Sequence, residues 1–132
     1  MVWIFQDGQR EFKYYWEGKV VKRDMDLIKK IMLEIQSESF NNTIQGYEEQ
    51  QVLYHVKLLI NANFVDGRCY DDNSTPKPSI VGVIVRDLTW QGHDFLDVLK
   101  DDSKFNTIKD LGKSLSLEAI KSALNQVIQN IL

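Results

Sequence analysis

The chain has 132 residues, of which 43% are apolar and 27% charged, and its 16 basic and 19 acidic side chains give a net charge of −3. This length suits one domain with one core, and this composition excludes an intrinsically disordered chain. The longest apolar runs, such as residues 80–85, are far below the about 20 residues that cross a bilayer. Because the start also lacks the basic region of a signal peptide, we expect a cytoplasmic protein with no membrane partner.

The residue types that carry common catalytic and metal chemistry are sparse. Cys69 is the single cysteine, and the two histidines, His55 and His93, lie far apart, so no zinc-ligand spacing is present. His93 and Asp97 are spaced as an acid/base pair on a helix, but no nucleophile motif or phosphate-binding glycine loop accompanies them. We therefore expect no enzyme activity and no cofactor.

Residues 1–20 allow two interpretations. Asp7-Gly8 lies between two β-prone runs and predicts the turn of a β-hairpin. Alternatively, this segment lies upstream of the native start, because residues 16–19 can be encoded by a purine-rich, ribosome-site-like stretch before Val20 or Val21. The first interpretation makes residues 1–20 an N-terminal extension, and the second makes them non-native. In both, residues 21–132 form the single domain.

Two amphipathic helices follow. Asp24 is a good N-cap for a helix over residues 25–37, whose apolar side chains recur at helical spacing. Residues 39–46 are loop material with room for a short strand. A second helix over residues 48–62 turns Val52, Val56 and Leu59 to the core, and Asn63 suits its left-handed exit.

The remainder of the chain predicts a hairpin and further helices. Residues 64–70 and 79–86 are β-prone and flank a polar turn at residues 71–78. Thr89 predicts the N-cap of a helix in which Gly92 permits close packing, and Asp101-Asp102-Ser103 predicts a helix break and a cap. A last helix over residues 116–131 carries an apolar stripe.

This order of elements predicts an α+β fold of the winged helix-turn-helix type, with a two-stranded wing and additional C-terminal helices. The segments KRDMDLI, GYEEQQVLYHVKLL and LTWQGHDFLD resemble an uncharacterised bacterial and phage family classed as a domain of unknown function, over about residues 21–112. The resemblance implies the winged-helix fold, and it carries no catalytic or ligand residues over to this chain.

In such a fold the helix over residues 48–62 is the recognition helix, which predicts a module that binds double-stranded DNA or a regulatory adaptor. Base edges would meet its amino end and outer face, and phosphates would meet its basic and amide side chains. The candidate DNA-binding residues are Gln50, Gln51, Tyr54, His55, Lys57, Asn61 and, on the wing, Lys77. Against this hypothesis, Glu48 and Glu49 begin the helix and Asp71 and Asp72 lie at the wing tip, where they repel phosphate.

Protein contact is the alternative to DNA binding. The stripe on the last helix either packs on the chain's own core or pairs with its copy in a homodimer. Its residues are Leu117, Ile120, Leu124, Val127 and Ile131. A module that uses the same fold to contact a protein partner, with no DNA binding, is the runner-up interpretation. A basic run, formed by Lys19, Lys22, Arg23, Lys29 and Lys30, is either a phosphate-binding surface or a solvated face.

Overall fold

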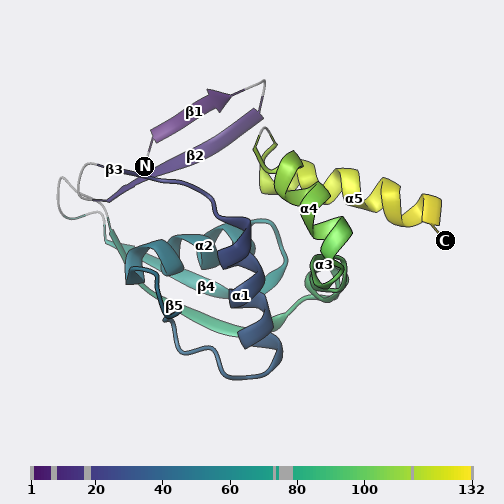
Figure 1. Cartoon of the computed structure of the whole chain (residues 1–132). Helices are drawn as coiled ribbons and strands as arrows, with labels where there is room; N and C mark the ends of the chain where they lie inside the picture. Colours follow the sequence, from purple (N-terminus) through teal and green to yellow (C-terminus); the bar gives the residue numbers. More distant parts are fainter. Residues whose placement is uncertain are drawn as a thin grey trace.

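The computed structural model describes the backbone of residues 2–6, 9–16, 19–72, 74, 79–113 and 115–131, and the side chains of residues 21–72, 74, 79–113 and 115–124. Helices α1 (Met25–Gln36) and α2 (Glu49–Asn61) cover one face of a hairpin formed by β4 (Val65–Asp72) and β5 (Ser79–Leu88). Helices α3 (Trp90–Lys100), α4 (Asp102–Leu111) and α5 (Leu117–Ile131) lie together beside this layer (Figure 1).

The N-terminal segment forms its own antiparallel sheet, in the order β1 (Val2–Gln6), β2 (Gln9–Trp16), β3 (Lys19–Val21). Gln6 pairs with Gln9, so the two strands expected on either side of residues 7–8 are present. The turn itself lies outside the described residues. β3 pairs with the end of β2 and was not expected, because three residues are too few to show a strand pattern.

The start of α1 confirms the predicted cap. The Asp24 carboxylate accepts hydrogen bonds from the backbone N–H groups of Asp26, at 2.9 Å, and Leu27, at 3.3 Å. These bonds satisfy two of the N–H groups that a helix leaves without partners at its first turn. Six apolar side chains of α1 are buried, namely those of Met25, Leu27, Ile28, Ile31, Met32 and Ile35.

The expected short strand within residues 39–46 is absent, and this part of the prediction is wrong. Between α1 and α2 the described chain makes turns and bends, with left-handed backbone at Glu38, Asn42 and Gly46. Repeated left-handed residues turn the chain too often for a strand to extend. Asn63, whose φ is 63°, confirms the predicted left-handed exit of α2.

The β4–β5 hairpin is confirmed and carries two irregularities. The register shifts between Asp66 and Gly67 and again between Tyr70 and Asp71, which leaves Arg86 and Val81 of β5 as the extra residues. Such bulges twist a hairpin and change the direction of the side chains beside them. The first strand extends two residues further than expected, to Asp72, and the second to Leu88.

The junction of β5 and α3 is built around Phe64, the residue before β4. The Thr89 hydroxyl accepts a hydrogen bond from the N–H of Gly92 at 3.0 Å and donates one to the carbonyl of Asn63 at 2.6 Å. A Cβ on Gly92 would lie 1.9 Å from the Phe64 carbonyl oxygen. The predicted cap and the predicted close approach are therefore both confirmed.

The predicted break at residues 101–103 is confirmed, and α4 follows it. The Asp101 carboxylate caps α4 by accepting from the Lys104 N–H, and this bond lowers the pKa of that carboxyl. Ser116 caps α5 by accepting from the Ala119 N–H at 3.2 Å. Among the described side chains, one core cluster runs through these helices, α1, α2 and the inner face of the hairpin.

The observed mixture of five described helices and an antiparallel hairpin is an α+β fold, and it is compatible with a winged-helix-like arrangement. In the described chain, however, α2 is preceded by a loop rather than by the helix that completes a helix-turn-helix motif. Among the described residues, no helix is long and apolar enough to span a membrane.

Candidate functional surfaces

The polar side of α2 is largely occupied by contacts within the chain. The Gln50 amide donates to the Ile80 carbonyl at 2.8 Å and accepts from the Ile80 N–H at 3.1 Å, so it covers part of the edge of β5. The Lys57 ammonium forms an ion pair with the Asp71 carboxylate at 2.8 Å. Two side chains expected at base edges or phosphates therefore contact the hairpin instead.

Tyr54 and His55 are also not on the surface, and the prediction that they project outward is wrong. Tyr54 is 3% exposed and His55 is fully buried. The reason is that α2 packs against α1 as well as against β4 and β5, so the buried arc of the helix is wider than its aliphatic stripe indicates. Of the other candidates, Gln51 is half-buried and Asn61 is exposed, and Lys77 lies outside the described residues.

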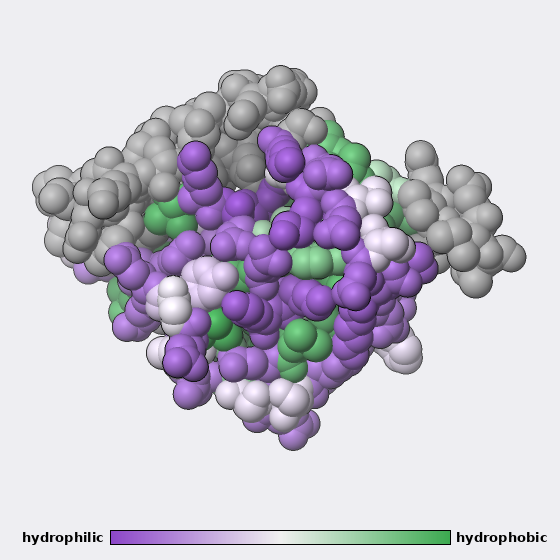
Figure 2. All heavy atoms as spheres, viewed as in Figure 1, coloured by the Kyte–Doolittle hydropathy of each residue, from purple (hydrophilic) through white to green (hydrophobic). Residues whose placement is uncertain are grey.

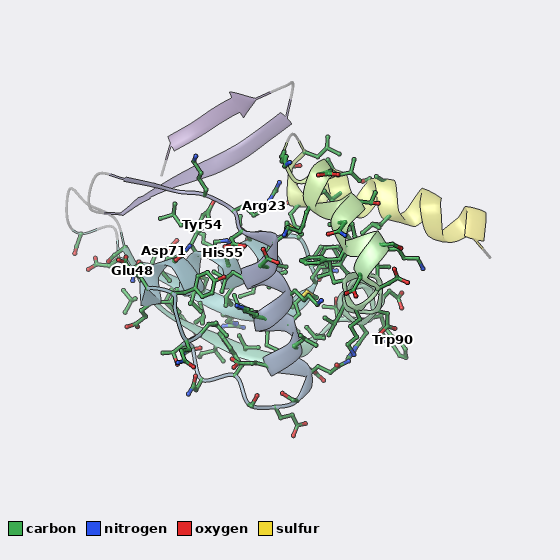
Figure 3. All side chains as sticks on the ribbon, viewed as in Figure 1. Arg23, Glu48, Tyr54, His55, Asp71 and Trp90 are labelled. Carbon is green, nitrogen blue, oxygen red and sulfur yellow. The ribbon has the colours of Figure 1, made fainter. Side chains whose placement is uncertain are left out.

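His55 holds the start of α1. Its Nε2 accepts a hydrogen bond from the Asp24 N–H at 2.8 Å, and its Nδ1 lies 2.7 Å from the Gln51 carbonyl oxygen. Because Nε2 is an acceptor, the proton of the neutral ring is on Nδ1, which donates to Gln51. Burial lowers the pKa of His55 below its ordinary 6.5, with the nearby Arg23 charge acting in the same direction. Figure 3 shows Arg23, Tyr54 and His55 close together.

The described side chains of the basic run contact different parts of the chain. The Arg23 guanidinium donates to the Gly112 carbonyl at 2.6 Å and to the Leu115 carbonyl, which joins the start of α1 to the segment between α4 and α5. The Lys29 ammonium lies over the Phe105 ring, 4.7 Å from its centroid, and Lys30 lies over Tyr47 at 5.3 Å. The Lys22 side chain is exposed, and that of Lys19 lies outside the described residues.

The face of the β4–β5 hairpin opposite the core carries exposed apolar side chains. Tyr70 is 46% exposed, Val81 66% and Ile84 54%. Tyr70 pairs with Gly82, and Ile84 lies two residues further along β5 on the same face. Val81 is the extra residue of the bulge beside Gly82, so the three exposed side chains are neighbours in the hairpin. We call this patch, with Gly82, the open sheet face.

Two exposed arginines border the open sheet face. Arg68 is directly opposite Ile84 in the register, and Arg86 follows Ile84 by two residues. Among the described residues, neither guanidinium forms a hydrogen bond or an ion pair. Gly82 has no atom within 4 Å of the place that a Cβ would take, and its φ is not positive. The centre of this face is therefore open to solvent and accepts a larger side chain without strain.

Trp90 is a separate exposed aromatic side chain, at the first position of α3. It is 88% exposed, whereas the other aromatic residue of that helix, Phe95, is buried and stacks on Phe64 with 4.4 Å between ring centroids. Figure 3 shows Trp90 at the periphery, away from the Arg23 and His55 region. By contrast, the face seen in Figure 2, which has α1 near its centre, is mostly hydrophilic.

The open sheet face and Trp90 were both missed as functional candidates. A signal was available in the unbroken apolar run at residues 80–85, because alternate residues of a strand point to opposite faces. In a hairpin covered on one face, such a run must leave apolar side chains exposed on the other. The sequence also predicts Trp90 in the core with Phe95, Leu96 and Leu99, and for Trp90 this is wrong, because its position beside the Thr89 cap lies on the opposite side of the helix from Leu99.

The described part of the apolar stripe on α5 packs into the chain's own core. Leu117, Ile120 and Leu124 are buried, at 4%, 0% and 8% exposure. The Lys121 ammonium donates to the Ala62 carbonyl at 2.8 Å, which fastens α5 to the end of α2. The side chains of Val127 and Ile131 lie outside the described residues. Packing on the chain's own core, rather than pairing with a second copy, therefore accounts for Leu117, Ile120 and Leu124.

His93 and Asp97, which are spaced for acid/base chemistry, and the thiol of Cys69 lie in the described part of the chain. No ion pair joins His93 and Asp97 there, and no group of three or more metal-ligating side chains is found among the described residues. Burial raises the pKa of the Cys69 thiol to about 11, and its charged neighbour Asp71 acts in the same direction. A thiol with so high a pKa is a poor nucleophile at neutral pH.

Comparison with known proteins supports the expected kinship with an uncharacterised family. An uncharacterized protein of Haemophilus influenzae is 34% identical over 118 residues, and the alignment covers 85% of this chain and 96% of the relative. No solved structure matches the chain. Residues 22–118, which include all three motifs, match the family described as "Hypothetical protein (DUF2513)". The chain belongs to this family of unknown function.

Proposed function

We propose that this protein is an interaction module that binds another protein through the open sheet face of the β4–β5 hairpin. The observation that carries the proposal is the contiguous exposure of Tyr70, Val81 and Ile84 on a face that the core does not use. Contiguous exposed apolar side chains on a folded domain commonly mark a contact surface for another macromolecule.

The residue types of this face also favour a protein partner. Tyrosine and arginine are enriched at protein interfaces and carry much of their binding energy. A partner suited to this face has apolar side chains that reach Gly82 between Val81 and Ile84, and carboxylates that meet Arg68 and Arg86. The exposed pair Asp66 and Asp87 lies on the same face beyond Arg68, so the border carries both signs of charge and a partner needs complementary charges of both signs.

DNA binding through α2 is the competing proposal, and the contacts of α2 support it less well. Tyr54 and His55 are buried, and Gln50 and Lys57 bond to the hairpin. The exposed residues at the amino end of α2 include Glu48 and Glu49, which repel phosphate. DNA contact by Arg68 and Arg86 is a distinguishable outcome of the same experiments.

The first experiment places a photo-crosslinking amino acid at Ile84 in the full chain inside cells, with the same probe at the exposed position Gln45 as control. We expect a discrete protein adduct at position 84 that is absent at position 45, and that disappears when Gly82→Arg is added. A Cβ at Gly82 meets no atom within 4 Å, so an arginine can be placed there on the outer face without displacing the core. Equal adducts at both positions, or none, would contradict the proposal.

The second experiment measures binding of the identified partner to the purified protein by calorimetry. Ile84→Ser and Arg68→Glu are each expected to weaken affinity by about tenfold, as the loss of an interface residue worth about 1.4 kcal/mol does. Glu48→Gln serves as a surface control and is expected to leave the affinity unchanged. Partner affinity that tolerates both Gly82→Arg and Ile84→Ser would place the contact elsewhere and overturn the proposal.

Random duplex DNA at low and moderate salt provides the discriminating control. Protein binding predicts no salt-sensitive DNA affinity, because a nonspecific electrostatic contribution accompanies DNA binding even when the target sequence is unknown. Salt-sensitive binding that is lost in Arg68→Glu and retained in Ile84→Ser would instead support DNA contact by this face. The same loss in Lys57→Glu alone would support α2.

A further inference from the structure

The exposed surface of α3 is a second place where the chain leaves an aromatic ring without cover. Trp90 is 88% exposed, more than Tyr70, Val81 or Ile84 on the open sheet face. Burying so large a ring releases more free energy than burying any aliphatic side chain, so leaving it in water forgoes a stabilisation that the core could have used. The position at the first turn of α3 keeps the ring away from the core.

Two exposed carboxylates continue the same helix face. Asp94 and Asp97 follow Trp90 at intervals of four and seven residues, which places all three side chains along one side of α3. Neither carboxylate has a recorded ion pair or hydrogen bond with a described side chain. Lys100, three residues after Asp97, donates instead to Gln36 at 2.9 Å. We call Trp90, Asp94 and Asp97 the α3 face.

The α3 face has the chemistry of a receptor for a cationic side chain. A tryptophan ring is the best aromatic face for a guanidinium or ammonium group, and a carboxylate binds a guanidinium through paired hydrogen bonds. Among the described residues, no cationic side chain of this chain binds the Trp90 ring or the carboxylates of Asp94 and Asp97. Charge complementarity therefore selects a positively charged occupant.

We propose that the α3 face docks an arginine-bearing segment of a protein partner, with a guanidinium stacked on Trp90 and held by Asp94 or Asp97. Arginine is favoured over lysine because its planar group both stacks on a ring and pairs with a carboxylate. This surface differs from the open sheet face in charge and in element, so it does not depend on that face binding a partner.

The test titrates the full chain with a short peptide of alternating glycine and arginine, followed by the indole N–H resonances in two-dimensional NMR. Trp90→Phe assigns the Trp90 resonance among the three tryptophans. The expected result is a saturable shift of that resonance, and no shift with a peptide in which citrulline replaces arginine. Citrulline retains the shape of the side chain and lacks its charge.

Matched variants separate a docking face from general attraction to an acidic protein. Asp94→Asn with Asp97→Asn removes two negative charges from the α3 face, and Glu48→Gln with Glu49→Gln removes the same charge from α2. The first pair is expected to weaken peptide binding by about fivefold or more and the second by less than about twofold, because screened distant charges contribute little. All variants are checked for an unchanged spectrum of core amides.

Equal weakening by both pairs, an unmoved Trp90 resonance, or equal binding of the citrulline peptide would each overturn the proposal. Gly82→Arg is expected to leave the titration unchanged, so a failure of this proposal and a failure of the open sheet face are distinguishable.

Discussion

The buried imidazole of His55 is a structural acceptor, and its bond to the Asp24 N–H fixes where α1 begins. The neutral ring alone can accept that bond, since a protonated imidazole has two donors and no acceptor. Protonation would also place a charge beside Arg23 in a buried site. The residue that the sequence offered as a phosphate contact therefore links the protonation of one ring to the stability of the fold.

We predict that the free energy of unfolding falls as the pH is lowered from about 7.5 to about 5.5, because the unfolded chain binds a proton near pH 6.5 that the folded chain resists. The stabilisation that comes from the neutral His55 ring is fully present at pH values above about 6.5, and it is lost progressively as the pH falls below that value. Urea unfolding across this range measures it. His55→Gln should flatten the dependence, and His93→Gln should leave it intact. A dependence that follows His93 instead would refute this assignment.

Gly92 is the other residue on which local structure depends. We predict that Gly92→Ala lowers the free energy of unfolding by about 2–3 kcal/mol, because its Cβ would overlap the Phe64 carbonyl and force the backbone apart. Gly82→Ala is the matched control, since its Cβ meets nothing within 4 Å, and it should be neutral or slightly stabilising. Chemical unfolding of both variants provides the measurement. Equal effects would disprove the packing role.

At the scale of elements, the sequence predicted the three helices and the β4–β5 hairpin of residues 25–100, but also a short strand within residues 39–46 that is absent. Their signals are local, as with the Asp24 and Thr89 caps and the left-handed Asn63. It could not predict which polar side chains the tertiary contacts would remove from solvent. Tyr54 and His55 look external on a helical projection, and they are buried because α1 and the segment before it close over a second side of α2. Periodicity in one helix carries no information about its number of neighbours.

Helix α5 gives a prediction at this scale. Ile120 is fully buried within the chain's own core, so Ile120→Ala is expected to lower the free energy of unfolding by about 3 kcal/mol through loss of packing. Ser122→Ala, at an exposed position of the same helix, is the control. The unfolding midpoint should not change with protein concentration. A midpoint that rises with concentration would show that the protein self-associates, which is the result expected if a second copy shares the stripe.

At the scale of the whole molecule, the two proposed surfaces are unlike in chemistry. The open sheet face is apolar with arginines beside it, and the α3 face is an aromatic ring with carboxylates beside it. The sequence alone does not locate either surface, because the exposure of a side chain depends on which face of its strand or helix the rest of the chain covers. The net charge of −3 averages over both and describes neither.

The hydrogen bonds of Arg23 to the carbonyls of Gly112 and Leu115 join positions separated by 89 and 92 residues. On the ribosome, the start of α1 emerges long before either carbonyl exists, so the first helix must wait for most of the chain before its amino end acquires all its partners. Contacts between such distant positions close late and slow folding. The order of synthesis therefore leaves the Arg23 contact among the last to form, and a chain truncated before residue 112 would lack it entirely.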